Sequence, residues 1–190
     1  MKKLPLIVGG SIVILLTAVF LVLYSMSNYG PKFKEVSYLT VPRIVEKPDR
    51  RMLVVEATGD PNKTVGPAFG LLFKTWYTIK DRPKGKDMRA PRARWPKPLE
   101  TPREQWVGIY ALPAGTSVTT IDQKPSKEGL HAELRWWRYG TVAEILHVGP
   151  YSTEDSTVRK LRKFITESGY EICGDHEEEY HCIISPITII

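Results

Sequence analysis

Apolar residues recur along the chain with two different periods, which predict an alternation of strands and helices. Short runs rich in β-branched and aromatic residues predict strands at residues 51–59, 105–112, 132–137, 140–148, 176–182 and 187–190. Apolar residues spaced three and four apart predict helices at residues 64–80 and 153–168. The buried stripes of these helices are Val65, Phe69, Leu72, Trp76 and Ile79 in the first, and Val158, Leu161, Phe164 and Ile165 in the second.

The predicted elements follow the same order in both halves of the chain. A strand ending in Gly and Pro leads into a helix and two further strands, first at 51–59, 64–80, 105–112 and 132–137, and again at 140–148, 153–168, 176–182 and 187–190. This order predicts an α+β fold, a duplicated β-α-β-β unit with pseudo-twofold symmetry and a central cleft between its halves. Residues 81–102, which contain five prolines, are expected to form a long loop.

Residues 4–24 form an uncharged apolar segment that follows Lys2 and Lys3. About 20 apolar residues span a bilayer as a helix, so we expect one N-terminal transmembrane anchor at 1–24, a linker at 25–50 and the folded domain at 51–190. The basic flank predicts a single-pass protein with its domain on the extracytoplasmic side of the membrane. The alternative is a cleaved signal peptide, whose apolar part is usually shorter, about 7 to 15 residues.

The charge of the chain is mildly positive and unevenly distributed. Its formal charge is +6, and without Lys2 and Lys3 there remain 25 basic residues against 21 acidic ones. An excess of this size does not favour a nucleic-acid partner. Residues 80–103 are strongly basic, which predicts either a solvated loop or a contact with anionic lipid head groups. The basic residues there are Lys80, Arg82, Lys84, Lys86, Arg89, Arg92, Arg94, Lys97 and Arg103.

The predicted strand at 176–182 carries the strongest candidate for a functional side chain. Alternation places His176, Glu178 and Tyr180 on one face, and Glu177 and Glu179 on the other. A buried carboxylate beside aromatic rings can hold a cation when ionised, or act as an acid when its pKa is raised. We therefore predict that Glu178 is central and that the neighbouring glutamates face solvent. The alternative is that Glu178 is an ordinary acid of an edge strand.

The strand at 105–112 is expected to form the opposite wall of the cleft. Trp106, Gly108 and Tyr110 share one face, and Gly108 is expected to leave room for a ligand, although packing of these aromatics in a core is the alternative. No compact zinc spacing, nucleophile elbow, phosphate loop or nucleotide fingerprint is present, so neither a metal nor a cofactor is expected. Cys173 and Cys182 are near enough in sequence for a disulfide, which stays undecided.

Two short motifs resemble a known family. His-x-Gly-Pro-Tyr at 147–151 and His-x-Glu-x-Tyr at 176–180, joined by a helix and Gly-Tyr at 169–170, resemble the GyrI-like small-molecule-binding superfamily. That group includes the effector-binding domains of AraC- and MerR-type regulators and the SOUL haem-binding relatives. The resemblance covers residues 51–190 and implies a cleft for hydrophobic, often cationic ligands above an acidic residue. It assigns this role to Glu178 and matches Tyr151, with Trp106 and Tyr110 corresponding more loosely.

These observations predict a membrane-anchored binding protein for a hydrophobic, possibly cationic small molecule. Its expected ligand-binding residues are Glu178, Tyr180, Tyr151, Tyr110 and Trp106. Two alternatives remain. One is a hydrolase of strained, cyclopropane-type molecules, in which Glu178, helped by Tyr151 or Tyr110, protonates the substrate or activates water. Glu144 and Glu133 are the candidates for a second carboxylate. The other is a membrane-tethered protein-interaction receptor that uses the basic residues 80–103.

Overall fold

The computed structural model describes residues 33–83, 90–98, 100–124, 126, 129–180 and 187–189. The predicted membrane segment at 4–24 lies outside these ranges, so the anchor stays a prediction. Within them, no helix has both the length and the apolar character needed to cross a bilayer.

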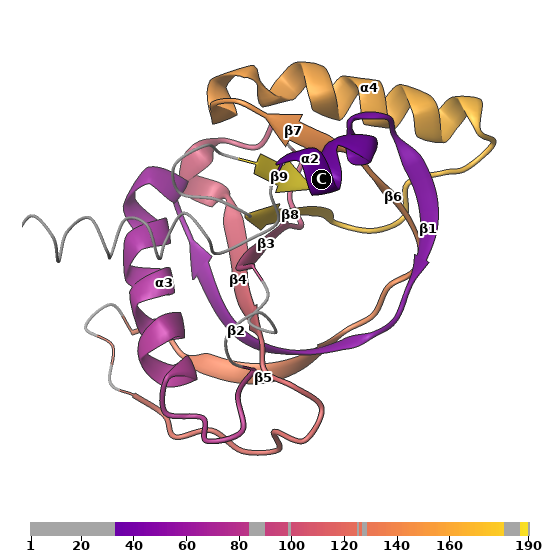
Figure 1. Cartoon of the computed structure of the whole chain (residues 1–190). Coiled ribbons are helices and arrows are strands. Elements are labelled where there is room, and N and C mark those ends of the chain that lie inside the picture. Colours follow the sequence, from indigo (N-terminus) through magenta and orange to yellow (C-terminus); the bar gives the residue numbers. More distant parts are fainter. Residues whose placement is uncertain are drawn as a thin grey trace, which may run out of the picture.

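Antiparallel strands dominate the fold, and the predicted α+β class is confirmed. Seven strands form one sheet, in the order β5 (Ala132–Trp137), β2 (Arg50–Thr58), β4 (Val107–Pro113), β3 (Arg92–Trp95), β8 (His176–Tyr180), β9 (Ile187–Ile189) and β7 (Leu146–Val148). A separate two-stranded sheet joins β1 (Arg43–Lys47) to β6 (Gly140–Glu144), and β6 leads through Ile145 into β7. Figure 1 shows the strands curving around a common centre.

The strand order corrects two expectations about the first half of the chain. Residues 81–102 are not a continuous loop, because β3 lies among them and pairs with both β4 and β8 near the middle of the sheet. Residues 132–137 do not complete the first unit either. As β5 they pair with the outer edge of β2, while β3 and β4 are the two strands that follow the first helix. Each half therefore contributes one central strand, and the halves meet where β3 pairs with β8.

Two helices lie on the outer side of the curved strands (Figure 1). Helix α3 (Pro61–Trp76) begins after Asp60, whose carboxylate accepts a hydrogen bond from the Asn62 backbone N–H at 3.0 Å, an N-cap that satisfies one otherwise unpaired donor. Its buried face covers β2 and β4, with Leu72 fully buried. Helix α4 (Glu154–Glu167) packs Val158 and Leu161 against Ile145.

Short elements at the start of the described chain pack against the second half. They are α2 (Phe33–Val36) and η1 (Ser37–Thr40). Two other short helical turns lie later in the chain: η3 (Arg103–Gln105) precedes β4, and η4 (Tyr151–Thr153) precedes α4. Val36 and Leu39 are buried against Leu146, and Lys160 Nζ of α4 donates to the Thr40 carbonyl at 2.9 Å. Residues 33–47, which the sequence assigned to a linker, thus supply helical turns and a strand to the domain.

Candidate functional site

Three neighbouring strands place Tyr110 and Glu178 on the same face of the sheet. Ala93 of β3 lies opposite Tyr110 of β4 on one side and opposite Glu178 of β8 on the other. Strands in a sheet are about 4.8 Å apart, so the backbones of Tyr110 and Glu178 are roughly 10 Å apart with only a methyl group between them. The two residues that the sequence singled out therefore lie side by side on one face of a single sheet, on either side of an alanine, and the strand at 105–112 is not the opposite wall of a cleft, as had been expected.

Aromatic rings surround this row of residues and form what we call the aromatic cluster: Phe69, Trp95, Trp106, Tyr110 and Tyr180. The ring of Phe69 on α3 lies 5.1 Å from that of Tyr110 and 6.2 Å from that of Tyr180. Trp95 lies 5.9 Å from Tyr110 and 5.6 Å from Trp106. Tyr110 is fully buried and the other four rings are half-buried. Three of the five predicted ligand-binding residues, Trp106, Tyr110 and Tyr180, thus belong to one cluster.

Glu178 is the most buried acid of its strand, with 7% of its surface exposed. The Tyr180 hydroxyl donates to its Oε2 at 2.6 Å, and His176 Nε2 lies 3.5 Å from its Oε1. Within the described part of the chain, no lysine or arginine forms an ion pair with this carboxylate. Tyr151, the fifth predicted residue, begins η4 just before α4, and its side chain is outside the described part.

A second carboxylate, Glu154, stands at the start of α4 and interacts with Glu178. Burial, followed by the negative charges of Glu178 and Asp155, raises the pKa of Glu154 to about 8. Its Oε1 is buried and has no hydrogen-bond partner among the described residues. At neutral pH this carboxyl group is therefore mostly protonated, beside a glutamate whose nearest partners are a tyrosine and a histidine.

The sequence pointed to the wrong residues for this second carboxylate. Glu144 forms ion pairs with Arg43 at 2.7 Å and Lys47 at 2.6 Å, and Glu133 is exposed and paired with Arg135. Glu154 lies in the first turn of α4, where an acid is explained by the helix dipole alone. A stronger signal was present, because residues 154, 158, 161 and 165 continue one helical stripe, so this acid lies in line with the buried apolar face.

Three buried polar atoms near Glu178 have no hydrogen-bond partner in the described part of the chain: Trp95 Nε1, Tyr110 Oη and Glu154 Oε1. Thr64 lies beside the Tyr110 hydroxyl, but the geometry is not that of a hydrogen bond. Burial, and to a lesser degree the charge of Glu178, raises the pKa of Tyr110, so the phenol keeps its proton. Buried polar groups are normally hydrogen-bonded, so each of these atoms has hydrogen-bonding capacity that the described residues do not use.

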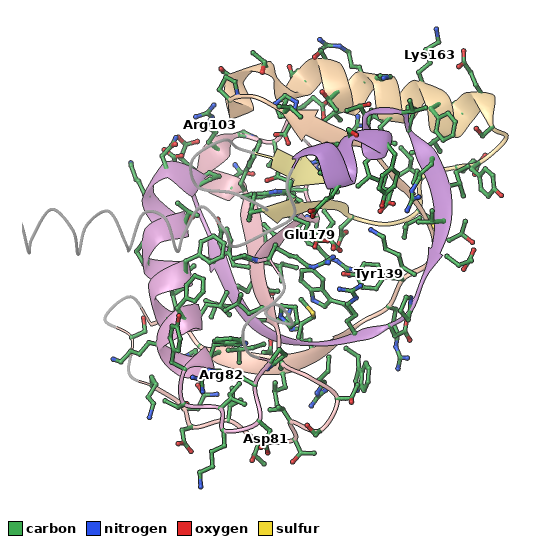
Figure 2. The ribbon with its side chains drawn as sticks, viewed as in Figure 1. Asp81, Arg82, Arg103, Tyr139, Lys163 and Glu179 are labelled. Carbon is green, nitrogen blue, oxygen red and sulfur yellow. The ribbon has the colours of Figure 1, made fainter. Side chains whose placement is uncertain are left out.

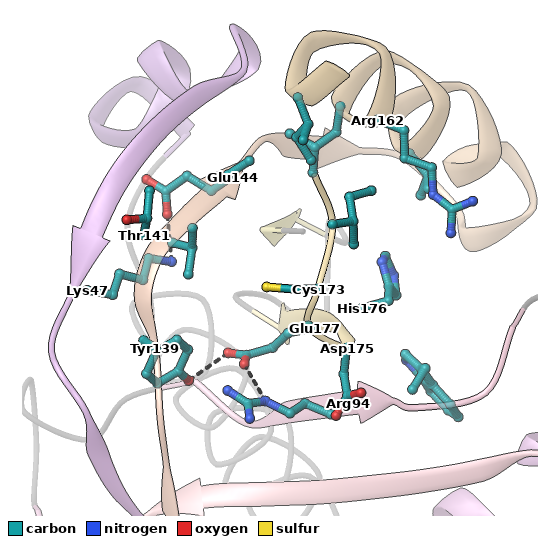
Figure 3. A pocket seen from close by; sticks show the side chains of 18 of the residues that line it. Lys47, Arg94, Tyr139, Thr141, Glu144, Arg162, Cys173, Asp175, His176 and Glu177 are labelled. Atoms are coloured by element: carbon teal, nitrogen blue, oxygen red, sulfur yellow. Dashed lines mark hydrogen bonds and ion pairs between the residues drawn. The ribbon is translucent and has the colours of Figure 1, made fainter. Parts of the chain in front are cut away.

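Two cavities border the aromatic cluster. The His176 cavity, about 440 Å³, borders the cluster at Trp95 and is lined by His176 and, on α4, by Val158, Leu161 and Ile165. It is also lined by Arg92, Glu177 and Glu179 on the side of the sheet opposite Glu178, which does not line it. Figure 3 shows His176 and Arg162 on one side of this cavity, and Lys47 and Glu144 on the other. The Trp106 cavity, about 520 Å³, lies between Trp106 and α4. Because Val158 and Arg162 line both, the inner side of α4 borders both spaces.

The opposite face of β8 corrects the expectation that Glu177 and Glu179 face solvent. Both pair with Arg92, which is only 2% exposed: its Nη1 lies 2.6 Å from Glu177 Oε1, and its Nη2 contacts Glu179 Oε2. The Tyr139 hydroxyl donates to Glu177 at 2.8 Å, and Arg94 Nε donates to the same carboxylate at 2.8 Å. Figure 2 shows Tyr139 and Glu179 on the inner side of the curved strands. The predicted alternation is right, but the curvature of the sheet buries this face too.

This arrangement, which we call the Arg92 network, also bears on the basic segment 80–103. Arg92 and Arg94 are engaged with acidic side chains, so neither is free to contact a lipid head group. Burial raises the pKa of Tyr139 to about 12, so its hydroxyl remains a donor at neutral pH. Residues 84–89 lie outside the described part, and lipid contact by the remaining basic residues stays a prediction.

Gly108 has a different role from the one expected. A Cβ at this position would lie 2.6 Å from the Tyr110 hydroxyl oxygen, so the space beside Gly108 is filled by that tyrosine. The glycine makes room for a site residue rather than for a ligand. Among the described residues, no group of three or more His, Cys, Asp or Glu side chains is placed to hold a metal ion. Cys182 lies outside these residues, so its pairing with Cys173 is not described.

Comparison with known proteins identifies the fold and leaves the function to be inferred. No protein-family model matches the chain, and no curated protein sequence matches it. An uncharacterized conserved protein from Listeria innocua has 19% identity and a TM-score of 0.62, over 82% of this chain and 95% of its own. A hydrolase from Listeria innocua has 20% identity and a TM-score of 0.60, over 83% and 95%.

The C-terminal domain of EcmrR has 12% identity and a TM-score of 0.57, over 78% of this chain and 92% of its own. EcmrR has also been solved in complex with DNA, and for this chain the absence of a nucleic-acid partner stays a prediction. At these identities the likeness concerns the fold alone. The chain therefore shares its fold with the EcmrR C-terminal domain and with two Listeria innocua proteins.

Proposed function

We propose that this domain binds a hydrophobic cation, held against Glu178 and enclosed by the aromatic cluster. The observation that carries the proposal is the environment of Glu178, a carboxylate that is 7% exposed and has no ion pair with a lysine or arginine among the described residues. Burying a carboxylate without a positive partner is costly. A cationic ligand would supply the missing charge.

The surroundings of Glu178 suit such a ligand. The faces of Trp, Tyr and Phe attract cations, and four half-buried rings of the cluster can contribute. Two cavities of about 440 and 520 Å³ border the cluster at Trp95 and Trp106, and their volumes fall within the usual range for small-molecule sites, about 300 to 1,000 Å³, but Glu178 lines neither of them. In the proposed arrangement, residues 4–24 anchor the domain to the extracytoplasmic side of a membrane.

The proposal is tested with two probes of the same shape and different charge, phenyltrimethylammonium and tert-butylbenzene. Because Trp95 and Trp106 belong to the cluster, their fluorescence reports binding of either probe. We expect the wild-type chain to prefer the cation, and Glu178→Gln to weaken cation binding at least tenfold, about 1.4 kcal/mol, without changing the affinity for the neutral probe.

The control variant is Glu167→Gln, which removes the same charge at the exposed end of α4, where Glu167 lies 3.6 Å from Lys163. It should bind both probes as the wild type does. Equal loss of cation binding in the Glu167 and Glu178 variants would show that only the net charge of the protein matters. Equal affinity of the wild type for both probes would refute a role for the carboxylate.

Glu154 favours a second candidate, the hydrolysis of strained cyclopropane-type molecules. A carboxyl group whose pKa is about 8 is protonated at neutral pH and can donate its proton to a ring carbon as the strained bond opens. Glu178 would accept a proton from the water that adds to the other carbon, so that water is added across the broken bond. Product formation from an activated aryl cyclopropane, lost in both Glu154→Gln and Glu178→Gln, would support this reaction. Binding without turnover would exclude it for that substrate.

A further inference from the structure

We propose that the His176 cavity is a second ligand site, and that it takes an anionic amphiphile, a carboxylate that carries one apolar chain. The site is separate from the one proposed above, because Glu178 does not line this cavity. The inference therefore goes beyond the binding of a cation at Glu178. It adds a ligand of the opposite charge on the opposite face of the sheet, beside the Arg92 network.

One wall of the cavity is apolar and is formed by helix α4 together with the two-stranded sheet. Val158, Leu161 and Ile165 of α4 line it, and Ala143 of β6 and Ile44 of β1 continue it. The volume of about 440 Å³ falls within the usual range for small-molecule sites, about 300 to 1,000 Å³. A wall of this kind favours a hydrocarbon chain, because the chain leaves water when it lies against it.

Another wall is polar and belongs to the Arg92 network. Figure 3 shows Arg94, Tyr139 and Glu177 together on this side. Arg92, which also lines the cavity, is 2% exposed, and its Nε has no hydrogen-bond partner among the described residues. The indole N–H of Trp95, a further lining residue, is likewise buried and unpaired. Both of these groups are N–H donors, so the unused hydrogen-bonding capacity suits a carboxylate oxygen and not an ammonium group.

A third part of the lining carries a positive charge in excess. Lys47 Nζ lies 2.6 Å from Glu144 Oε2, and Arg43 Nη2 lies 2.7 Å from Oε1 of the same carboxylate. The side chain of Glu144 is 6% exposed, so two cations share one buried acid. Lys47 lines the cavity and stands with Glu144 on one side of it (Figure 3). An anionic head group beside Lys47 would balance the second positive charge.

The other charged side chains around the cavity do not reverse this balance. Six basic and five acidic side chains line it. Three of the five acids are paired with lysine or arginine, and the other two, Glu171 and Asp175, are exposed, so water screens their charge. Arg162 of α4 lines the cavity and forms no ion pair among the described residues. The charges around the cavity therefore favour an anion over a cation.

Cys173 provides a local reporter of occupancy. Its side chain is exposed and lines the cavity, and Figure 3 shows it between Lys47 and His176. A ligand in the cavity should therefore slow the alkylation of this thiol by the neutral reagent iodoacetamide. Proteolytic cleavage after glutamate separates Cys173 from Cys182, because residues 177–179 are glutamates. Mass spectrometry of the reduced, labelled full chain thus follows Cys173 alone.

The proposal is tested with three probes that share a ten-carbon chain and differ in the head group: decanoate, decanol and decyltrimethylammonium. Each is titrated at pH 8 against the rate of Cys173 alkylation, and the free probe concentrations that halve the rate are compared. We expect decanoate to act at a concentration about tenfold lower than decanol, and decyltrimethylammonium to be the weakest of the three.

Lys47→Met should bring decanoate close to decanol and leave decanol unchanged. Glu144 keeps Arg43 as its partner in this variant, so no buried acid is left unpaired. The control is Lys74→Met, which removes the same charge at an exposed position in the last turn of α3 and should behave as the wild type does.

The comparison of the three probes on the wild type needs no substitution, so it decides the charge of the ligand even where Lys47→Met does not fold. Equal protection of Cys173 by decanoate and decanol, or stronger protection by decyltrimethylammonium, would overturn the preference for an anion. An equal loss of decanoate protection in the Lys47 and Lys74 variants would show that only the net charge of the protein matters. Failure of every probe to protect Cys173 would overturn the site itself, and none of these results bears on cation binding at Glu178.

Discussion

Replacing Arg92 with methionine removes the positive charge that two acidic side chains share on the inner face of the sheet. Arg92 is 2% exposed and contacts both Glu177 and Glu179. Breaking a buried ion pair from one side typically costs about 3–5 kcal/mol, because a buried charge is left without compensation. Glu177 also accepts hydrogen bonds from Arg94 and Tyr139, so we expect the lower end of that range, about 3 kcal/mol.

Urea unfolding of the full chain measures this loss. With a slope of about 2 kcal/mol per molar urea, Arg92→Met should lower the midpoint by roughly 1.5 M. Removing all three charges, in Arg92→Met with Glu177→Gln and Glu179→Gln, should restore part of the stability, since the two acids are then neutral and the remaining cost is the loss of the ion pair between Arg94 and Glu177. The control is Arg135→Met, which disrupts only exposed pairs with Glu56 and Glu133 and should cost less than about 1 kcal/mol. Equal midpoint shifts for Arg92→Met and Arg135→Met would refute the assignment of Arg92 to a buried network.

Three further predictions concern the core and the candidate site. Gly108→Ala should destabilise the fold by about 1–3 kcal/mol in urea and weaken cation binding, because the added methyl group meets the Tyr110 side chain at 2.6 Å; unchanged binding would contradict the placement of Tyr110. Leu72→Ala, at a fully buried position of α3, should cost about 2–5 kcal/mol by the same measurement. Glu154 holds its proton more tightly in the folded state, where its pKa is about 8, than in the unfolded chain, where its pKa has the ordinary value of 4.5, so its contribution to stability is present at low pH and is lost as the pH rises through that interval. Unfolding midpoints of the wild type should therefore decline relative to those of Glu154→Gln between pH 5 and pH 8, and a constant difference between them would contradict the raised pKa.

Much of the candidate site was predictable from local periodicity. The apolar stripe that includes Phe69 and Leu72 identified α3. Alternation along two strands indicated which face of its strand each of Tyr110 and Glu178 occupies. Both inferences depend only on the geometry of a helix or a strand, so neither required knowledge of how the strands pair. The pairing of β3 between β4 and β8 places both residues on one face of the same sheet, whereas the sequence predicted two opposite walls of a cleft.

The features that the sequence missed depend on contacts between distant segments. β3 was taken for loop because Arg92 and Arg94 lie in a basic stretch between prolines, and their partners Glu177 and Glu179 come more than 80 residues later. Those acids appeared solvent-facing for the same reason. Periodicity identifies the face of a strand, but it does not tell whether the curvature of the sheet buries that face. Glu154 was missed because a glutamate at the start of a helix has an adequate local explanation.

The most direct test of the central claim is a crystal structure of the chain with phenyltrimethylammonium bound. The account predicts the quaternary nitrogen beside the Glu178 carboxylate and within about 6 Å of the centres of rings in the aromatic cluster. A cation found instead beside Glu177 and Glu179 at the Arg92 network, with the aromatic cluster unchanged, would contradict the claim that Glu178 is the centre of the site.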